Sequence, residues 1–328
     1  MESRIARICQ NKTAVSIGTH DGKFHTDELV AIALIAHCFG HQCKFQVIRS
    51  RDPKILEQCD IVLDVGYKNH GKYFDHHGRD FNELHPGTKF KLAATGIVWY
   101  DLKDIIIDMM GLKMFNRSVR EMAEELVFKR FILPTDADDN GQFAARPSGP
   151  QQINLPEIVN SFNVTVLKTD DPLLHFNQCL ELVRTIMYHK FLEISRQATE
   201  NNRIQTALLS APIEDRRAGL FVLLDQGPWI TVVLNNWDDA ADFKLCIFPG
   251  DMPNQWKIQT FPGSRYERRV QRCPAPSWMK GYQKNSVKRL TEEFDVIFVH
   301  SDGFIGCVQG TLEEAKAFAK LWISQSGN

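Results

Sequence analysis

Short apolar runs alternate with helix-like segments through the first hundred residues of the chain. Runs typical of buried strands occupy 14–18, 45–47, 61–63 and 72–74, and the longer run at 29–39 has the length of a buried helix. Strands that alternate with helices in this way form mostly parallel sheets with helices packed on their faces. The pattern therefore predicts an α/β domain with a mostly parallel sheet flanked by helices.

Polar side chains follow each of these strands at the point where the apolar run ends. His20 follows the first strand, Arg49 and Arg51 the second, Asp64 the third and Asp75-His76-His77 the fourth. Ligands of open α/β sheets bind outside the carboxyl ends of the strands. We therefore expect these residues to meet at one edge of the sheet, although Arg49 and Arg51 could also be an ordinary solvated pair.

The pattern changes in the second half of the chain, which predicts two domains. A long helix at 170–202 leads from an N-terminal domain, 1–205, into a smaller α+β domain, 206–328. The other expected elements are a short helix at 54–58, a helical region at 92–130, a polar loop at 135–141, a loop-rich stretch at 142–168, strands at 220–224, 230–234, 244–248, 256–261 and 296–300, and a closing helix at 312–324.

The charge balance and the cysteines exclude several classes of protein. With 39 Lys+Arg against 40 Asp+Glu, the net charge is −1, so the chain does not coat nucleic acid through a general positive field. Eight cysteines without a CxxC pair favour reduced thiols in an intracellular protein, with cytoplasm, nucleus and mitochondrion all open. No apolar run reaches the roughly 18 residues of a membrane span, so we expect no membrane association.

The strongest local signal is His20-x4-His25-x-Asp27, which places three metal-capable side chains at a turn between a strand and a helix. Imidazole and carboxylate ligands together suit Mn, Fe, Co or Zn better than Ca. The alternative is a loop with two ordinary histidines and a helix-capping aspartate at position 27.

Two further signals follow the third and fourth strands. Asp64 ends an apolar run, where a carboxylate is unfavourable unless it is paired or binds metal; otherwise it is a plain loop-start aspartate. In Asp75-His76-His77 the consecutive side chains point in different directions. Such a turn can supply a metal ligand, its supporting partner and a group that faces substrate.

The stretch Thr135–Gly141 carries three aspartates in four residues, of which Asp136 is the first. It lacks the spacing and closing glutamate of a helix-flanked calcium loop. We interpret it as a further source of metal ligands, and a solvated acidic turn remains the alternative.

In this order, the four clusters resemble the motifs of the DHH phosphoesterase superfamily, and more closely those of its melanocyte-proliferating-gene (Myg) family. The resemblance spans residues 15 to 322 and rests on Ile17-Gly18-Thr19-His20-Asp21-Gly22-x-Phe24-His25-x-Asp27-Glu28, Arg49-x-Arg51-Asp52-Pro53, Asp64-Val65-Gly66, Asp75-His76-His77, Asp139-Asn140-Gly141 and His300-x-x-Gly303-Phe304-Ile305-Gly306. The departures from the family pattern leave every candidate ligand in place: Gly78 stands for Gln, Tyr67 for a second glycine, Ala94-Thr95-Gly96 for Ser-Ala-Gly, and Asp302 and Cys307 for smaller residues.

The resemblance implies a two-metal hydrolase that acts as a 3′–5′ exoribonuclease on RNA or a short single-stranded oligonucleotide, in a cleft between the two domains. Two divalent ions are implied, with Mn²⁺ as the first choice and Mg²⁺, Co²⁺ or Zn²⁺ as alternatives. His25 stands where the wider superfamily has Asp, which favours Mn²⁺ or another transition metal over Mg²⁺. The residues implied are His20, His25 and Asp64 for one metal, Asp27, Asp64, His76 and Asp136 for the other, Asp75 and His77 for catalysis, and Arg49, Arg51, Arg265, Arg268, Arg269, His300, Gly303 and Phe304 for substrate.

Two other functions stay open. The near-neutral charge is compatible with a small-molecule phosphatase or pyrophosphatase on the same scaffold. A non-catalytic metal-binding regulatory protein is the third reading, and the intact set of ligand candidates argues against it. The aromatic rings of Trp278 and Phe304 could stack a base or simply pack in the core, and the sequence leaves the oligomeric state open.

Overall fold

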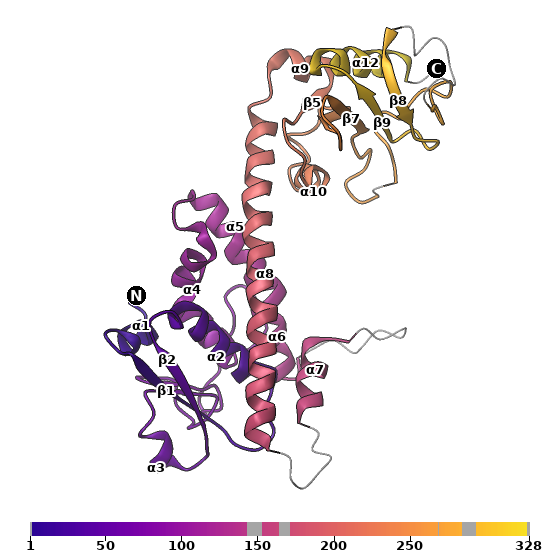
Figure 1. The fold of residues 1–328 in the computed structure, drawn as a ribbon. Coiled ribbons are helices and arrows are strands. Elements are labelled where there is room, and N and C mark those ends of the chain that lie inside the picture. Colours follow the sequence, from indigo (N-terminus) through magenta and orange to yellow (C-terminus); the bar gives the residue numbers. More distant parts are fainter. Residues whose placement is uncertain (1, 143–152, 164–170, 268, 284–292, 327–328) are drawn as a thin grey trace. The chain divides into compact units, whose positions relative to one another are not determined.

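The computed structural model describes residues 2–142, 153–163, 171–267, 269–283 and 293–326. The chain forms two compact units, Met1–Ala198 and Thr199–Asn328, and the division falls within helix α8 (Pro172–Leu209). Figure 1 shows the elements of both units.

The first unit contains a parallel sheet with the strand order β2-β1-β3-β4. Its strands are β1 (Ala14–Thr19), β2 (Lys44–Arg49), β3 (Ile61–Leu63) and β4 (Tyr73–Phe74). All three pairings are parallel, with Thr19 opposite Arg49 and Leu63 opposite Phe74. The strand ends are therefore aligned, and the residues that follow them meet at one edge of the sheet, as an α/β fold requires.

Helix α2 (Thr26–Phe39) explains the long apolar run of the sequence, because every one of its residues except His37 is buried. It packs against α4 (Ala94–Ile107). The unit is completed by α1 (Arg4–Cys9), α3 (Pro53–Leu56), the π-helical turn η1 (Asp108–Leu112), α5 (Arg117–Val127), the turn η2 (Phe128–Ile132), α6 (Leu133–Asp139) and α7 (Leu155–Phe162).

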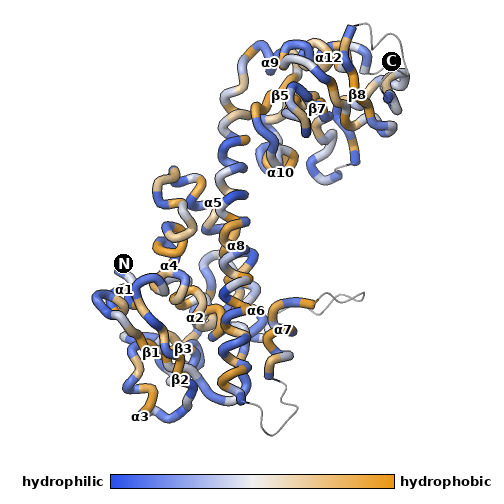
Figure 2. The backbone as a smooth tube through the Cα atoms, in the orientation of Figure 1, coloured by the Kyte–Doolittle hydropathy of each residue, from blue (hydrophilic) through white to orange (hydrophobic). Residues whose placement is uncertain are grey.

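Helix α8 is amphipathic, and Figure 2 shows hydrophilic (blue) and hydrophobic (orange) residues along it. Its buried side chains recur at helical spacing, including Phe176, Val183, Phe191 and Ile194, and they join the core of the first unit. None of the described helices is long and apolar enough to span a membrane.

The polar stretch 135–141 was wrongly expected to be a loop, because α6 extends to Asp139 and only Asn140 and Gly141 leave the helix. Thr135, Asp136 and Ala137 are buried, so tertiary contacts override the polar composition. Within the stretch expected to be loop-rich, helix α7 forms over 155–162, where the Asn154 side chain caps it by accepting a hydrogen bond from the Glu157 N–H (3.0 Å). Residues 143–152 and 164–170 of that stretch lie outside the described residues.

The second unit is built on a five-stranded mixed sheet with the order β5-β6-β7-β9-β8. Strands β5 and β6 are parallel, and the other pairings are antiparallel. The described elements are α9 (Ile213–Ala218), β5 (Leu220–Val222), α10 (Trp229–Asn235), β6 (Leu245–Pro249), β7 (Gln255–Thr260), β8 (Asp295–Val299), β9 (Ile305–Gln309) and α12 (Leu312–Gln325).

Two local expectations for this unit were wrong. The strand expected at 230–234 is helix α10, because Trp229, Val232 and Val233 share one helical face that is buried in the core. Strand β9 lies between the strand expected at 296–300 and the helix expected at 312–324, where no strand was expected. All eight cysteines of the chain are buried and free of disulfide bonds.

Candidate metal centre

A cavity of about 410 Å³ lies at the carboxyl edge of the parallel sheet in the first unit. It is lined by His20, His25, Arg51, Asp64, Val65, Gly66, Tyr67, Asp75, His76, His77, Asp139 and Asn140. Most of the residues expected at this edge are therefore brought together around one space.

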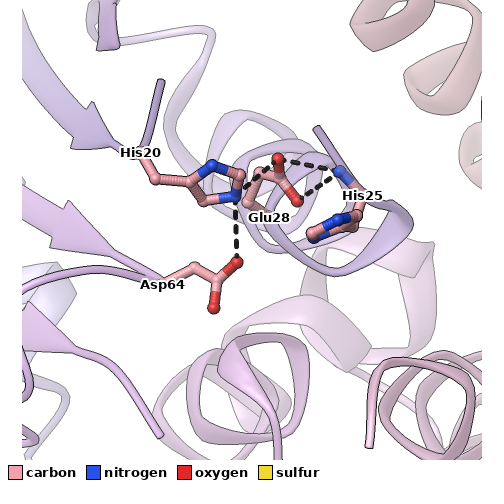
Figure 3. A group of neighbouring side chains, drawn as sticks. All are labelled: His20, His25, Glu28 and Asp64. Carbon is pink, nitrogen blue, oxygen red and sulfur yellow. Dashed lines mark hydrogen bonds and ion pairs between the residues drawn. The ribbon is translucent and has the colours of Figure 1, made fainter. Parts of the chain in front are cut away.

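The first metal-capable group contains His20, His25, Glu28 and Asp64, whose ligand atoms lie within 4.8 Å of one another (Figure 3). His20 Nε2 lies 3.1 Å from Glu28 Oε1 and 3.4 Å from Asp64 Oδ2. His20 follows β1, Asp64 follows β3, and the other two side chains belong to the start of α2. The strand ends and the helix start thus supply one ligand set.

Glu28 was not among the predicted ligands. It is the third residue of α2, and both its carboxylate oxygens accept a hydrogen bond from the backbone N–H of His25 (2.9 Å). The signal for this contact is the spacing of a capping box, in which a glutamate stands three residues after the N-cap. Glu28 is completely buried and touches His20, so it either orients that ring or joins it at a metal.

A second group contains Asp64, Asp75, His76 and His77, and a third contains Asp27, His76 and Asp139. His76 Nδ1 lies 3.6 Å from Asp64 Oδ1, and His76 Nε2 lies 3.1 Å from Asp139 Oδ2. Asp64 thus belongs to the first two groups and His76 to the last two. Shared ligands of this kind are what two neighbouring metal positions need.

Asp75 stabilises the turn, because both of its carboxylate oxygens accept hydrogen bonds. Its Oδ1 accepts hydrogen bonds from His77 N (3.1 Å) and from His77 Nδ1 (2.7 Å), and its Oδ2 accepts one from Tyr67 N. Burial opposes the charged form of Asp75, but these hydrogen bonds outweigh it and lower its pKa. The bond to Asp75 in turn raises the pKa of His77, although burial of the ring opposes this.

Asp136, one of the predicted metal ligands, lies outside the three groups found among the described residues. Its two oxygens accept hydrogen bonds from Ala93 N (2.8 Å) and Gly96 N (3.0 Å) at the start of α4, and His85 Nε2 lies 2.9 Å from Oδ2. Asp139, one helical turn later on α6, is the aspartate that reaches His76. The acidic run therefore does bring a carboxylate to the site, but from a different position.

Asp27 and Asp136 share the N-terminus of α4. Asp27 accepts hydrogen bonds from Ala94 N (2.8 Å) and Thr95 N (2.7 Å), which lie between the two N–H groups bound by Asp136. The exposed N–H groups and the helix dipole stabilise both buried carboxylates. Helix α4 therefore anchors α2, which carries Asp27, and α6, which carries Asp139.

The charges of the site fit a bound cation. Burial, and after it the nearby carboxylates of Asp139 and Asp64, raise the pKa of Asp27 well above its usual value. Burial opposes the charged form of His20, but its contacts with Asp64 and Glu28 outweigh this effect and raise its pKa to about 10. Buried carboxylates this close to one another are stabilised by a positive partner, either a proton or a metal ion.

Two buried atoms give an independent test of this fit. Asp64 Oδ1 and His76 Nδ1 are buried and face each other at 3.6 Å, and neither has a hydrogen-bond partner in the described part of the chain. Buried polar atoms without partners are rare unless an ion or water satisfies them. Because the donors are imidazole nitrogens and carboxylate oxygens, the residues fit a divalent transition metal.

The two arginines after β2 have different surroundings. Arg51 lines the cavity, and its Nε lies 3.2 Å from Asp21 Oδ1. Arg49 is not among the residues that line the cavity: its guanidinium stacks 4.7 Å from the centroid of the Phe176 ring and donates a hydrogen bond to the Gly22 carbonyl (2.8 Å). Arg49 thus supports the loop after β1.

Three of the six predicted substrate residues of the second unit lie in one turn. His300, Gly303 and Phe304 connect β8 to β9, and the rings of His300 and Phe304 lie 4.6 Å apart between centroids. Gly303 has a φ of 71°, which a glycine adopts without strain. Arg265 and Arg269 are exposed, and Arg268 lies outside the described residues.

Comparison with known proteins covers nearly the whole chain. The family model MYG1_exonuc, described as "Uncharacterised protein family (UPF0160)", matches residues 16–323. A MYG1 protein of Schizosaccharomyces pombe is 29% identical over 318 residues, covering 92% of this chain and 96% of its own. The MYG1 exonuclease of Homo sapiens is 28% identical over 327 residues, covering 94% and 86%.

Among solved structures, the exonuclease RecJ bound to manganese is 13% identical, and the match covers 98% of this chain and 93% of that chain with a TM-score of 0.25. The range that the family model matches includes the strand ends and helix starts that build the cavity. Because the family model extends from β1 to α12, this chain belongs to the MYG1_exonuc family.

Proposed function

We propose that the protein is a metal-dependent phosphodiesterase of the DHH type that removes nucleotides one at a time from RNA or short single-stranded nucleic acid. The observation that carries this proposal is the position of Asp64. It belongs to two metal-capable groups, and one of its buried oxygens has no hydrogen-bond partner among the described residues. Relatives named MYG1 exonuclease support the choice of activity, and the ordered motifs support the superfamily.

In this proposal, two divalent ions occupy the cavity. His20, His25 and Asp64 hold one, with Glu28 beside His20, and a second set of ligands consists of Asp27, Asp64, His76 and Asp139. Divalent ions bound there would activate a water molecule and neutralise phosphoryl oxygens. The mixed nitrogen and oxygen donors favour Mn²⁺, and Asp139 takes the place that the sequence had assigned to Asp136.

His77 is proposed to protonate the leaving oxygen. Its side chain lines the cavity and is half exposed, and its Nδ1 is held 2.7 Å from Asp75 Oδ1. That contact fixes the ring and leaves Nε2 as the nitrogen that can reach substrate. General acids of this kind typically contribute a factor of about 100 to 10,000 to the rate.

The size of the cavity favours the end of a strand. About 410 Å³ is within the range of pockets for single small ligands, roughly 300–1,000 Å³, and suits one nucleotide better than a duplex. Arg51 supplies a planar guanidinium for a phosphate oxygen. We further propose that residues 206–328 form a substrate domain, in which Arg265, Arg268, Arg269, His300, Gly303 and Phe304 bind the part of the substrate farther from the metals, and that residues 1–205 form the catalytic domain.

The test uses the full-length protein and RNA oligomers labelled at either end, with Mn²⁺ or with EDTA. We expect Mn²⁺-dependent release of labelled mononucleotide at once from 3′-labelled RNA, and a ladder of shortened products from 5′-labelled RNA. Internal cleavage, or hydrolysis that survives EDTA, would contradict the proposal. Hydrolysis of pyrophosphate or free nucleotides, with oligomers left intact, would identify a small-molecule phosphatase instead.

A matched pair of variants assigns the activity to the cavity. Asp64→Asn should lower the rate by more than about 100-fold, because it removes charge at the shared position. Asp101→Asn is the control: Asp101 is also largely buried, but it accepts hydrogen bonds from Arg4 N and Ile5 N at the start of α1 and does not line the cavity. Equal losses in the two variants would mean that Asp64 acts only through stability.

A further inference from the structure

We infer that the ring of Tyr67 stacks against the nucleobase of the nucleotide whose phosphate reaches the metal centre. This inference rests on the proposed function and specifies its ligand as a nucleoside phosphate rather than any phosphate ester. Tyr67 lies in the turn after β3 and lines the same cavity as His77 and Asn140. It stands where the family pattern described above has a second glycine.

The backbone of Tyr67 adopts a conformation that favours glycine. Its φ is 61°, and the left-handed region is unfavourable for a residue with a side chain. The surroundings hold it there, because Tyr67 N donates to Asp75 Oδ2 while Asp75 N donates to the Lys68 carbonyl. Strain that the surroundings enforce concentrates at ligand-binding and catalytic sites.

Tyr67 is also largely exposed to solvent. It is 71% exposed, although burial of a large aromatic ring is one of the main sources of folding energy. A strained backbone that presents an exposed ring beside a cavity contributes little to folding, so its advantage lies in binding a ligand.

The chemistry of that ligand follows from the neighbours of the ring. Arg51, His77 and the metal-capable groups of the same cavity account for a phosphate. A flat aromatic surface beside a phosphate site complements a nucleobase, and such stacking tolerates any base because every base has an aromatic face. The cavity therefore suits a nucleotide without a strong preference for one base.

The test measures binding, so it does not depend on turnover. Calorimetry with Mn²⁺-loaded full-length protein compares adenosine 5′-monophosphate with ribose 5-phosphate, which differ only by the base. Wild type should bind the nucleotide roughly tenfold more tightly. Tyr67→Phe should keep this preference, and Tyr67→Leu should abolish it while the affinity for ribose 5-phosphate is unchanged.

Tyr188→Leu is the control, because Tyr188 is an exposed tyrosine of α8 (51%) that does not line the cavity. Equal affinity of wild type for the two ligands, no binding of either at millimolar concentration, or a preference that persists in Tyr67→Leu would overturn the inference. Failure to hydrolyse RNA would instead overturn the proposed activity, since the binding comparison stands by itself.

Discussion

Replacing Gly96 by alanine should destabilise the first unit, although alanine is the better helix former. An added Cβ would lie 2.1 Å from Asp136 Oδ2 and 2.8 Å from His85 Cε1. Both neighbours are fully buried, so neither can turn out into solvent. The carboxylate of Asp136 must move, and it loses its hydrogen bonds from Ala93 N and Gly96 N.

The expected size of this effect follows from those two bonds. Each hydrogen bond to a charged acceptor contributes about 1.5–3 kcal/mol to stability. Replacing glycine by alanine in a helix stabilises the helix by about 1 kcal/mol. The net loss in the free energy of unfolding should therefore be about 2–5 kcal/mol, measured by urea denaturation of the full chain. Because the same helix start also holds Asp27, Mn²⁺ binding should weaken as well.

A double-mutant cycle separates this mechanism from a general helix effect. Asp136→Ala removes the group that the new methyl would strike, so Gly96→Ala should cost much less in that background than in wild type. Additive effects of the two substitutions, or a Gly96→Ala protein as stable as wild type, would refute the reasoning.

Three further predictions concern the metal centre and the second unit. His77→Ala should lower kcat on RNA by about 100-fold or more while bound Mn²⁺, measured by metal analysis, stays constant; a lost metal would instead make His77 a ligand. His300→Ala should weaken hydrolysis of oligomers about tenfold or more but hardly affect bis-p-nitrophenyl phosphate, and equal losses on both substrates would contradict a role in binding the distant part of the oligomer. Mn²⁺ should raise the melting temperature relative to EDTA, because a ligand that binds only the native state stabilises it, and this rise should vanish in Asp64→Asn; a rise that persists in the variant would place the stabilising ion elsewhere.

Much of the parallel sheet could be predicted because its strands are short apolar runs that end in polar residues. The prediction that His20, Asp64 and His76 lie together follows from that alternation, since parallel strands align their carboxyl ends. His25 was predicted beside them from the spacing of its motif with His20. Glu28 was missed because a capping glutamate and a ligand glutamate look the same in sequence. In the structure Glu28 does both, because it caps α2 and also contacts His20 (3.1 Å).

Other predictions failed where tertiary contacts decide between two local choices. Asp136 and Asp139 stand three residues apart in one acidic run that was wrongly expected to be a loop, so nothing local could tell which of the two carboxylates contacts His76. The structure distinguishes them, because the carboxylate of Asp136 contacts His85 and accepts hydrogen bonds from the start of α4. The β-branched run 230–234 likewise favours a strand, but packing around Trp229 makes it a helix.

The eight buried thiols make the chain a reporter of its own unfolding. Burial raises the pKa of Cys9 and of Cys38 to about 12 and that of Cys179 to about 11, so little reactive thiolate forms at neutral pH. Alkylating reagents should therefore modify the folded chain slowly, and each modified cysteine identifies a region that has opened. A single cysteine introduced at an exposed position such as Met114 (91% exposed) could accept a fluorescent or spin label without removal of the native ones.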